Sequence, residues 1–164
     1  QTVANAVKVA GEYDIDLLTV HGIGGSKMLE AAADAASSCS KPPKIVAVTT
    51  LTSLGNEDLL DIGVSRSIND QAISLGELAV NSGIDGLVTS AHEARVLRDK
   101  FPESILVTPG IRLPSDSIND QKRVATPSFA VEQGSTHLVV GRSILHSNNP
   151  SLVVEEIFND LKRK

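Results

Sequence analysis

The stretch Leu138-Val139-Val140-Gly141-Arg142 ends an apolar run on a glycine and leads into a segment with helical character. A parallel strand that ends in this way directs backbone N–H groups and the positive end of a helix dipole at any group lying above it. The Arg142 guanidinium adds planar, bidentate donors that suit a phosphate. The stretch therefore predicts a phosphate site at the C-terminal mouth of a parallel β structure, with Gly141 and Arg142 as its donors.

Strands and helices alternate along the rest of the chain. We expect short apolar strands over residues 16–20, 44–49, 86–89, 105–107 and 137–140. We expect helices over residues 2–13, 26–37, 57–62, 69–81, 91–100 and 151–161, with Ser26 capping the second of them. Such alternation is typical of parallel β/α units, in which helices cover a sheet that is buried on both faces.

Two architectures accommodate this alternation, a doubly wound open sheet and a (β/α)8 barrel. The segment His21-Gly22-Ile23-Gly24-Gly25 lacks the third glycine position of a dinucleotide fingerprint, which gives a nucleotide-binding doubly wound sheet little support. Polar and glycine residues recur after every strand, as the active face of a barrel requires. Because a typical barrel takes about 250 residues, we expect residues 1–164 to form a single domain, the C-terminal part of a (β/α)8 TIM barrel. About five of the eight strands would lie in this chain, and three further β/α units would precede Gln1 in the intact protein.

The composition is that of a soluble globular protein, with 41% hydrophobic and 21% charged residues. A net charge of −5 and only four aromatic side chains, none of them Trp, argue against nucleic acid as a partner. The apolar runs are far shorter than a membrane span, so no membrane association is expected. Cys39 has no second cysteine to pair with, and the expected setting is cytoplasmic.

Three motifs together carry a resemblance to a known family. Leu106–Arg112 contains Thr-Pro-Gly-Ile-Arg, Asp120 and Gln121 follow it, and Val140–Arg142 closes the series. In this combination and order the chain resembles bacterial orotidine 5′-phosphate decarboxylase over nearly its whole length. The resemblance implies a (β/α)8 barrel, a homodimer, and a reaction that uses no metal and no cofactor.

The catalytic motif of that family has no counterpart in this chain. The resemblance implies a lysine on the second barrel strand and an Asp-x-Lys-x-x-Asp motif on the third, and no such motif occurs between residues 1 and 164. Gln1 and Thr2 resemble the last two residues of that segment. We therefore expect the catalytic residues to lie outside these positions. In the intact enzyme, the resemblance implies, CO2 leaves C6 of orotidine 5′-phosphate, a lysine protonates C6, and UMP is formed.

The resemblance assigns a substrate-binding role to residues that are present. Arg142 matches the arginine that pairs with the 5′-phosphate, and Gly141 supplies a backbone N–H beside it. Gln121 matches a glutamine that bridges phosphate and pyrimidine from a closing loop, and Arg112, where that loop begins, matches a ligand-contacting arginine. This chain would therefore hold the phosphate end of orotidine 5′-phosphate and of UMP.

Other matches place residues at the pyrimidine. Thr52 matches a hydroxyl residue that meets the base, and Pro109 and Gly110 would line that side of the pocket. Thr2 matches a threonine that reaches the neighbouring site of the family dimer. Thr52 could instead satisfy a turn, and Arg112 could serve only to brace its own loop.

Two other classes of protein stay open on the sequence. One is another phosphate-binding barrel enzyme such as a 3-hexulose-6-phosphate synthase, which is similar to this family in fold but lacks the Thr-Pro-Gly-Ile-Arg segment with its Asp-Gln loop. The other is a non-catalytic partial barrel that binds a phosphate ligand or a protein partner.

Overall fold

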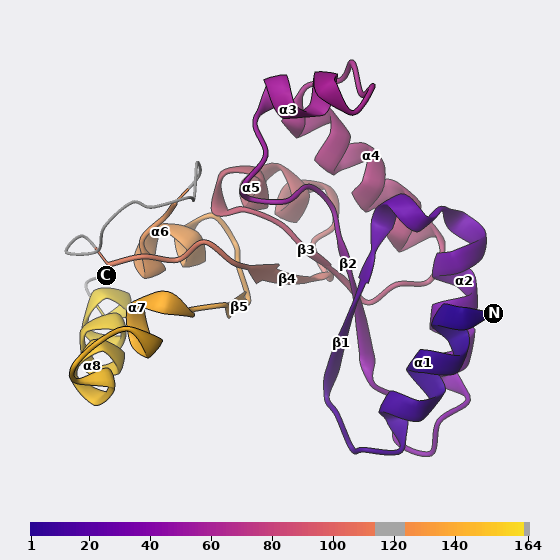
Figure 1. Cartoon of the computed structure of the whole chain (residues 1–164), viewed down its shortest axis with the longest axis horizontal. Coiled ribbons are helices and arrows are strands. Elements are labelled where there is room, and N and C mark those ends of the chain that lie inside the picture. The colour runs from indigo at the N-terminus through magenta and orange to yellow at the C-terminus, as the bar shows by residue number, and fades with distance from the viewer. Residues whose placement is uncertain (114–123, 163–164) are drawn as a thin grey trace.

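The computed structural model describes residues 1–113 and 124–162, which contain one five-stranded parallel sheet (Figure 1). Its strands are β1 (Leu17–His21), β2 (Lys44–Val48), β3 (Gly86–Val88), β4 (Ile105–Thr108) and β5 (His137–Leu138). The helices are α1 (Thr2–Gly11), α2 (Ser26–Ser37), α3 (Asn56–Asp61), α4 (Ile68–Asn81), α5 (Ala91–Lys100), α6 (Pro127–Glu132), α7 (Arg142–Leu145) and α8 (Pro150–Leu161), with a 3-10 turn at Gly22–Gly24.

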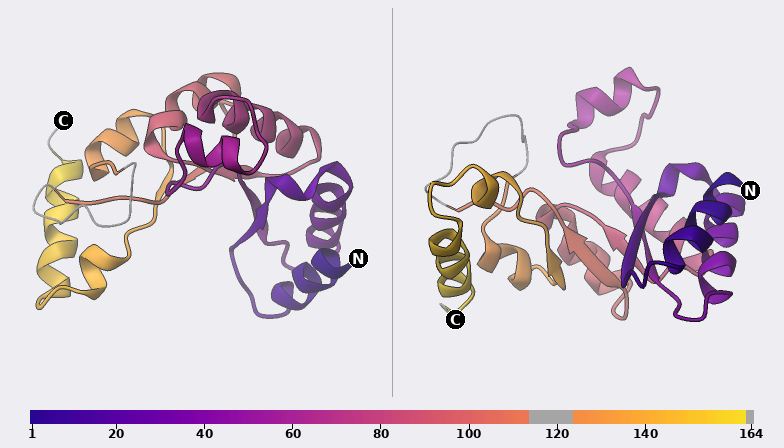
Figure 2. Two further views of the ribbon diagram at one scale, coloured as in Figure 1. Left: turned by 45° about the horizontal axis from the view of Figure 1, so that its top comes forward. Right: turned by 60° about the horizontal axis from the view of Figure 1, so that its bottom comes forward.

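The strand order in space is the order along the chain, β1-β2-β3-β4-β5. In a doubly wound sheet the order reverses at a switch point, and no reversal occurs among these strands. The helices lie along the convex side of the curved sheet, as Figure 2 shows. This arrangement decides between the two predicted architectures in favour of the β/α barrel type.

The main core lies between the sheet and its helices. Alternate strand residues point to the helices because successive side chains of a strand face opposite ways. The buried strand residues of this core are Val20, Ile45, Ala47, Leu87 and Leu106. The long helices contribute Val7, Leu29, Ala79 and Leu97 to the same cluster. On the opposite face of β1, Thr19 and His21 are exposed.

Side-chain caps explain several helix starts. The hydroxyl of Ser67 accepts from the amide of Asp70 at the start of α4, and Ser90 caps α5 in the same manner. Pro127 and Pro150 occupy first-turn positions, where the missing N–H costs nothing. The predicted cap at Ser26 is wrong, because Gly25 at φ 83° is the N-cap residue and Ser26 is the first residue inside α2.

Other predicted boundaries differ by a few residues. The first helix ends at Gly11 rather than residue 13, and the last strand covers His137–Leu138 rather than 137–140. The short helix α6 was not predicted, because one or two turns are too few for a helical periodicity, and the helical segment expected after Gly141 is the four-residue α7. Across the described ranges no helix has both the length and the apolar character that crossing a bilayer would demand.

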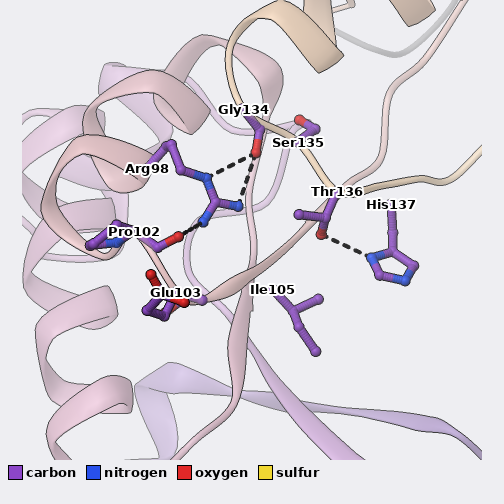
Figure 3. Close-up of a pocket in the computed structure, with 9 residues that line it drawn as sticks. Arg98, Pro102, Glu103, Ile105, Gly134, Ser135, Thr136 and His137 are labelled. Atoms are coloured by element: carbon purple, nitrogen blue, oxygen red, sulfur yellow. Dashed lines mark hydrogen bonds between the residues drawn. The ribbon is translucent and has the colours of Figure 1, made fainter.

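The side chain of Arg98 links the segments that precede β4 and β5. The Arg98 guanidinium donates to the Gly134 carbonyl through Nε (3.2 Å) and Nη2 (3.0 Å), and to the Pro102 carbonyl through Nη1 (2.5 Å), as Figure 3 shows. These bonds fix α5 to the loops before β4 and β5. The pocket around Arg98, about 410 Å³, lies at the edge of the sheet opposite the polar strand exits.

Removing the Arg98 side chain should therefore destabilise the fold. Arg98→Ala leaves the carbonyls of Gly134 and Pro102 without this donor. A hydrogen bond to a charged group contributes about 1.5–3 kcal/mol, so we expect a loss of that size in the free energy of unfolding, measured by denaturant titration of the intact protein. Arg95 is the matched control, because its partner Asp99 is equally exposed and Arg95→Ala should change stability by less than about 0.5 kcal/mol. Equal losses in the two variants would contradict this role of Arg98.

Candidate functional site

The carboxyl ends of the strands meet at one edge of the sheet. The register aligns His21 with Val48, Val48 with Val88, and Val88 with Val107. The ladder continues past the strands, since Thr89 N donates to the Val107 carbonyl at 3.0 Å and Val139 N to the Thr108 carbonyl at 2.9 Å. The segments that follow β1 to β5 therefore emerge side by side.

Most of the predicted site residues belong to these exits. Thr52 lies in the segment after β2 and is buried. Pro109, Gly110 and Arg112 follow β4, and Gly141 and Arg142 follow β5. The structure thus brings three separate parts of the predicted site to the same edge. Gln121 lies outside the described residues.

Thr2 is placed at this edge by a different element. It is exposed at the start of α1 and lines a pocket with Gly24, Lys27 and Met28, which form the exit of β1 and the start of α2. Because β1 and β5 are the two outer strands of the sheet, Thr2 and Arg142 lie at opposite ends of the row of exits. The described chain therefore separates Thr2 from the other candidates.

Gly141 forms the turn between the β5 exit and α7. Its carbonyl accepts from the amides of Ile144 and Leu145, each at 3.0 Å, so Arg142 is the first helical residue. A Cβ at Gly141 would meet no heavy atom within 4 Å of the described residues, so the approach to its backbone is open. The expected helix is confirmed but has only four residues, so local N–H groups rather than a long helix dipole carry any attraction for an anion here.

The chain after β4 is held in a fixed turn. Gly110 has φ 79°, a conformation that favours glycine. Arg112 N donates to the Ala125 carbonyl at 2.9 Å, Ala125 N donates to the Gly110 carbonyl at 3.2 Å, and Ile111 and Ala125 form a parallel bridge. The Arg112 guanidinium donates from Nη1 to the Ile111 carbonyl at 2.8 Å. Arg112 is half-buried, and its side chain is held by the carbonyl of the preceding residue.

A second, small hydrophobic core packs against the turn after β4 and the exit of β5. Ile111, Ala91 and Ala130 are its buried members. Ala125, Phe129, Leu138 and Val140 pack against them. This core joins the turn after β4 to the exit of β5, which ends at Gly141. The two stretches that carry Arg112 and Arg142 therefore rest on one set of apolar contacts.

Three buried hydroxyl groups lie near this edge. Thr50, Thr89 and Ser143 follow β2, β3 and β5, and each is at least nine-tenths buried. Among the described residues, none of the three hydroxyl oxygens has a hydrogen-bond partner. A buried polar group without a partner costs about 1–3 kcal/mol, and such groups are uncommon outside functional or strained sites. Their only signal in the sequence is a polar residue soon after an apolar strand.

No metal-binding cluster is found in the part of the chain that the structure describes. Within residues 1–113 and 124–162, no three side chains of His, Cys, Asp or Glu are grouped so that they could hold one. Backbone amides, hydroxyls and two arginines at the described edge can donate hydrogen bonds to a ligand.

Comparison with known proteins adds a family and solved relatives. The family model described as "Orotidine 5′-phosphate decarboxylase / HUMPS family" matches residues 1–157. A protein of Legionella pneumophila (strain Corby) named orotidine 5′-phosphate decarboxylase is 44% identical over 162 residues, which are 98% of this chain and 71% of that protein. A protein of the same name from Hydrogenovibrio crunogenus is 45% identical, over 95% of this chain and 66% of its own.

The fold has a close solved counterpart. The crystal structure of orotidine 5′-phosphate decarboxylase from Lactobacillus acidophilus superposes with a TM-score of 0.82 at 33% identity, and the match covers 98% of this chain and 70% of that one. The predicted TIM-barrel fold class is thereby confirmed, since this neighbour belongs to a TIM-barrel family.

The turn at Gly110 generates a prediction with an internal control. Gly63 has nearly the same conformation, φ 80° against 79°, but lies between α3 and α4. A side chain in the left-handed region costs roughly 1–2 kcal/mol, so Gly110→Ala and Gly63→Ala should lose similar stability in denaturant titrations. Gly110→Ala alone should also speed amide hydrogen exchange at Ala125, whose N–H bonds to the Gly110 carbonyl. Unchanged exchange at Ala125 would show that the turn does not depend on this glycine.

Proposed function

Because the chain belongs to the orotidine 5′-phosphate decarboxylase / HUMPS family, we propose that its protein decarboxylates orotidine 5′-phosphate to UMP, the final step of pyrimidine biosynthesis. The observation that carries this proposal is an identity of 44% over 98% of the chain to a relative of that name. The curated relatives from Legionella, Idiomarina and Hydrogenovibrio all carry the decarboxylase name, which favours this reaction over a synthase or a non-catalytic barrel.

We assign this chain the binding part of the reaction. The Asp-x-Lys-x-x-Asp motif that the resemblance implies does not occur in residues 1–164, so no group for the proton transfer to C6 is assigned here. Arg142 and the Gly141 N–H would hold the 5′-phosphate, and Arg112 and Gln121 would add contacts from the chain after β4. Thr52, Pro109 and Gly110 would line the pyrimidine side.

Phosphate binding contributes to a reaction that occurs at the base. Binding energy from a non-reacting part of a substrate can offset the cost of orienting and desolvating the reacting part. The two arginines rest on one small core, so a phosphate held by them would be fixed relative to the sheet edge. The pyrimidine would then be presented to the strand exits, where Thr52 lies.

A homodimer is part of the proposal. Thr2 would reach the neighbouring site, and its exposure at the start of α1, away from the other candidates, supports that role. Leu51, Leu60 and Ile62, between the end of β2 and the residue after α3, are exposed apolar side chains that a partner could cover. The cytoplasmic setting expected from the single Cys39 also stays part of the proposal.

Loss of the Arg142 side chain should weaken phosphate binding selectively. Arg142→Ala in the intact protein should weaken UMP by roughly 1.5–3 kcal/mol, the usual contribution of a hydrogen bond to a charged group. Uridine has no phosphate and should lose far less. Titration calorimetry of both ligands on wild type and variant measures the difference. Equal losses for UMP and uridine would remove Arg142 from the phosphate site.

Activity should not depend on a metal ion. The intact protein should release CO2 from orotidine 5′-phosphate at an unchanged rate after treatment with a chelator and removal of the chelated ions. The comparison is between treated enzyme, untreated enzyme and treated enzyme resupplied with Mg²⁺. A rate that falls on chelation and returns with Mg²⁺ would favour the synthase alternative.

A further inference from the structure

The C-terminal helix packs against the elements on both sides of the candidate phosphate site. α8 contacts α6 and α7, and Figures 1 and 2 show it beside both. α7 begins at Arg142. α6 begins two residues after Ala125, which bridges to Ile111 and bonds to the Arg112 amide. The elements next to Arg112 and Arg142, α6 and α7, therefore both pack against α8.

One charged contact fixes α6 to α8. The amide of Ser128 donates to Oδ2 of Asp160 at 2.8 Å, and both residues are partly buried. Pro127 has no N–H, and Thr126 Oγ1 accepts from Phe129 N at 3.3 Å. The first-turn amides of α6 are thus satisfied by one local cap and by a carboxylate from 32 residues further along the chain.

A carboxylate is well suited to this position. It accepts a stronger, shorter hydrogen bond from an amide than a neutral group does, and its charge is favoured at the start of a helix. Asp160 lies in the last turn of α8, one turn after buried Ile157. Its hydrogen bond with Ser128 gives the contact between α6 and α8 a fixed direction.

We propose that Asp160 is a positioning residue for the phosphate site, holding the Arg112 segment in register with Arg142 through α6 and α8. It acts through the backbone and touches no substrate. The inference rests on the proposed function, since it assumes that Arg112 and Arg142 bind one phosphate ligand. A role limited to capping would alter α6 alone and would leave ligand affinity unchanged.

The test compares three variants of the intact protein. Asp160→Ala removes the acceptor, Asp160→Asn keeps an acceptor oxygen without the charge, and Glu155→Ala removes an exposed acid from the same helix. Hydrogen exchange at the Ser128 amide reports the contact itself, and the dissociation constants of UMP and uridine report the site. Asp160→Ala should speed exchange at Ser128 and weaken UMP roughly fivefold or more, with uridine changed less than about twofold. Asp160→Asn should restore most of the UMP affinity, and Glu155→Ala should resemble wild type.

The outcomes separate this inference from the proposed function. Fast exchange at Ser128 in Asp160→Ala, with UMP affinity equal to that of wild type, would reduce Asp160 to a cap and overturn the positioning role. Equal weakening of UMP by Asp160→Ala and Glu155→Ala would overturn it as well, because the effect would then not depend on the contact with Ser128. Wild-type protein that binds no UMP would overturn the proposed function and, with it, this inference.

Discussion

Parallel pairing between consecutive strands is the constraint on which the rest of this structure depends. A strand that pairs in parallel with the next one must be followed by a crossover, and here each crossover contains a helix on the same side of the sheet. Every strand therefore ends at the same edge. The strand pairing alone brings the residues after each strand together there, and no contact among those residues is needed. Thr52, Gly110 and Arg142 are far apart in the sequence and share an edge for this reason alone.

Much of the fold could be predicted from the sequence, because the strands are short apolar runs and the longer helices carry their own periodicity. All five strands were expected near their observed positions, and α2 and α5 have the expected bounds. The failures lie where local backbone geometry decides. Gly25 rather than Ser26 caps α2 because its positive φ ends the preceding turn, and α6 is too short to leave a pattern.

Less of the candidate site than of the fold could be predicted from the residues alone. Gly141 and Arg142 could be selected on chemical grounds, but Thr52, Arg112 and Thr2 came from the family resemblance. The buried hydroxyls of Thr50 and Thr89 were missed because burial without a partner is a property of three-dimensional packing. Nothing in the sequence marks Asp160, and only the structure shows it bonded to Ser128. Contacts between distant segments of this kind leave no periodicity and no motif.

The agreement between strand order and chain order also bears on how the molecule acquires its structure. Among the described residues each strand pairs with its neighbours in the sequence, so these pairings close loops of one β/α unit rather than a loop spanning the domain. The entropy lost on ordering can then be recovered one unit at a time, and the sheet can lengthen as the polypeptide emerges during synthesis. The second core, which unites the turn after β4 with the exit of β5, is complete only when the last of these units is in place. Assembly of the edge that carries Arg112 and Arg142 is thus a late event in a process whose earlier steps are local.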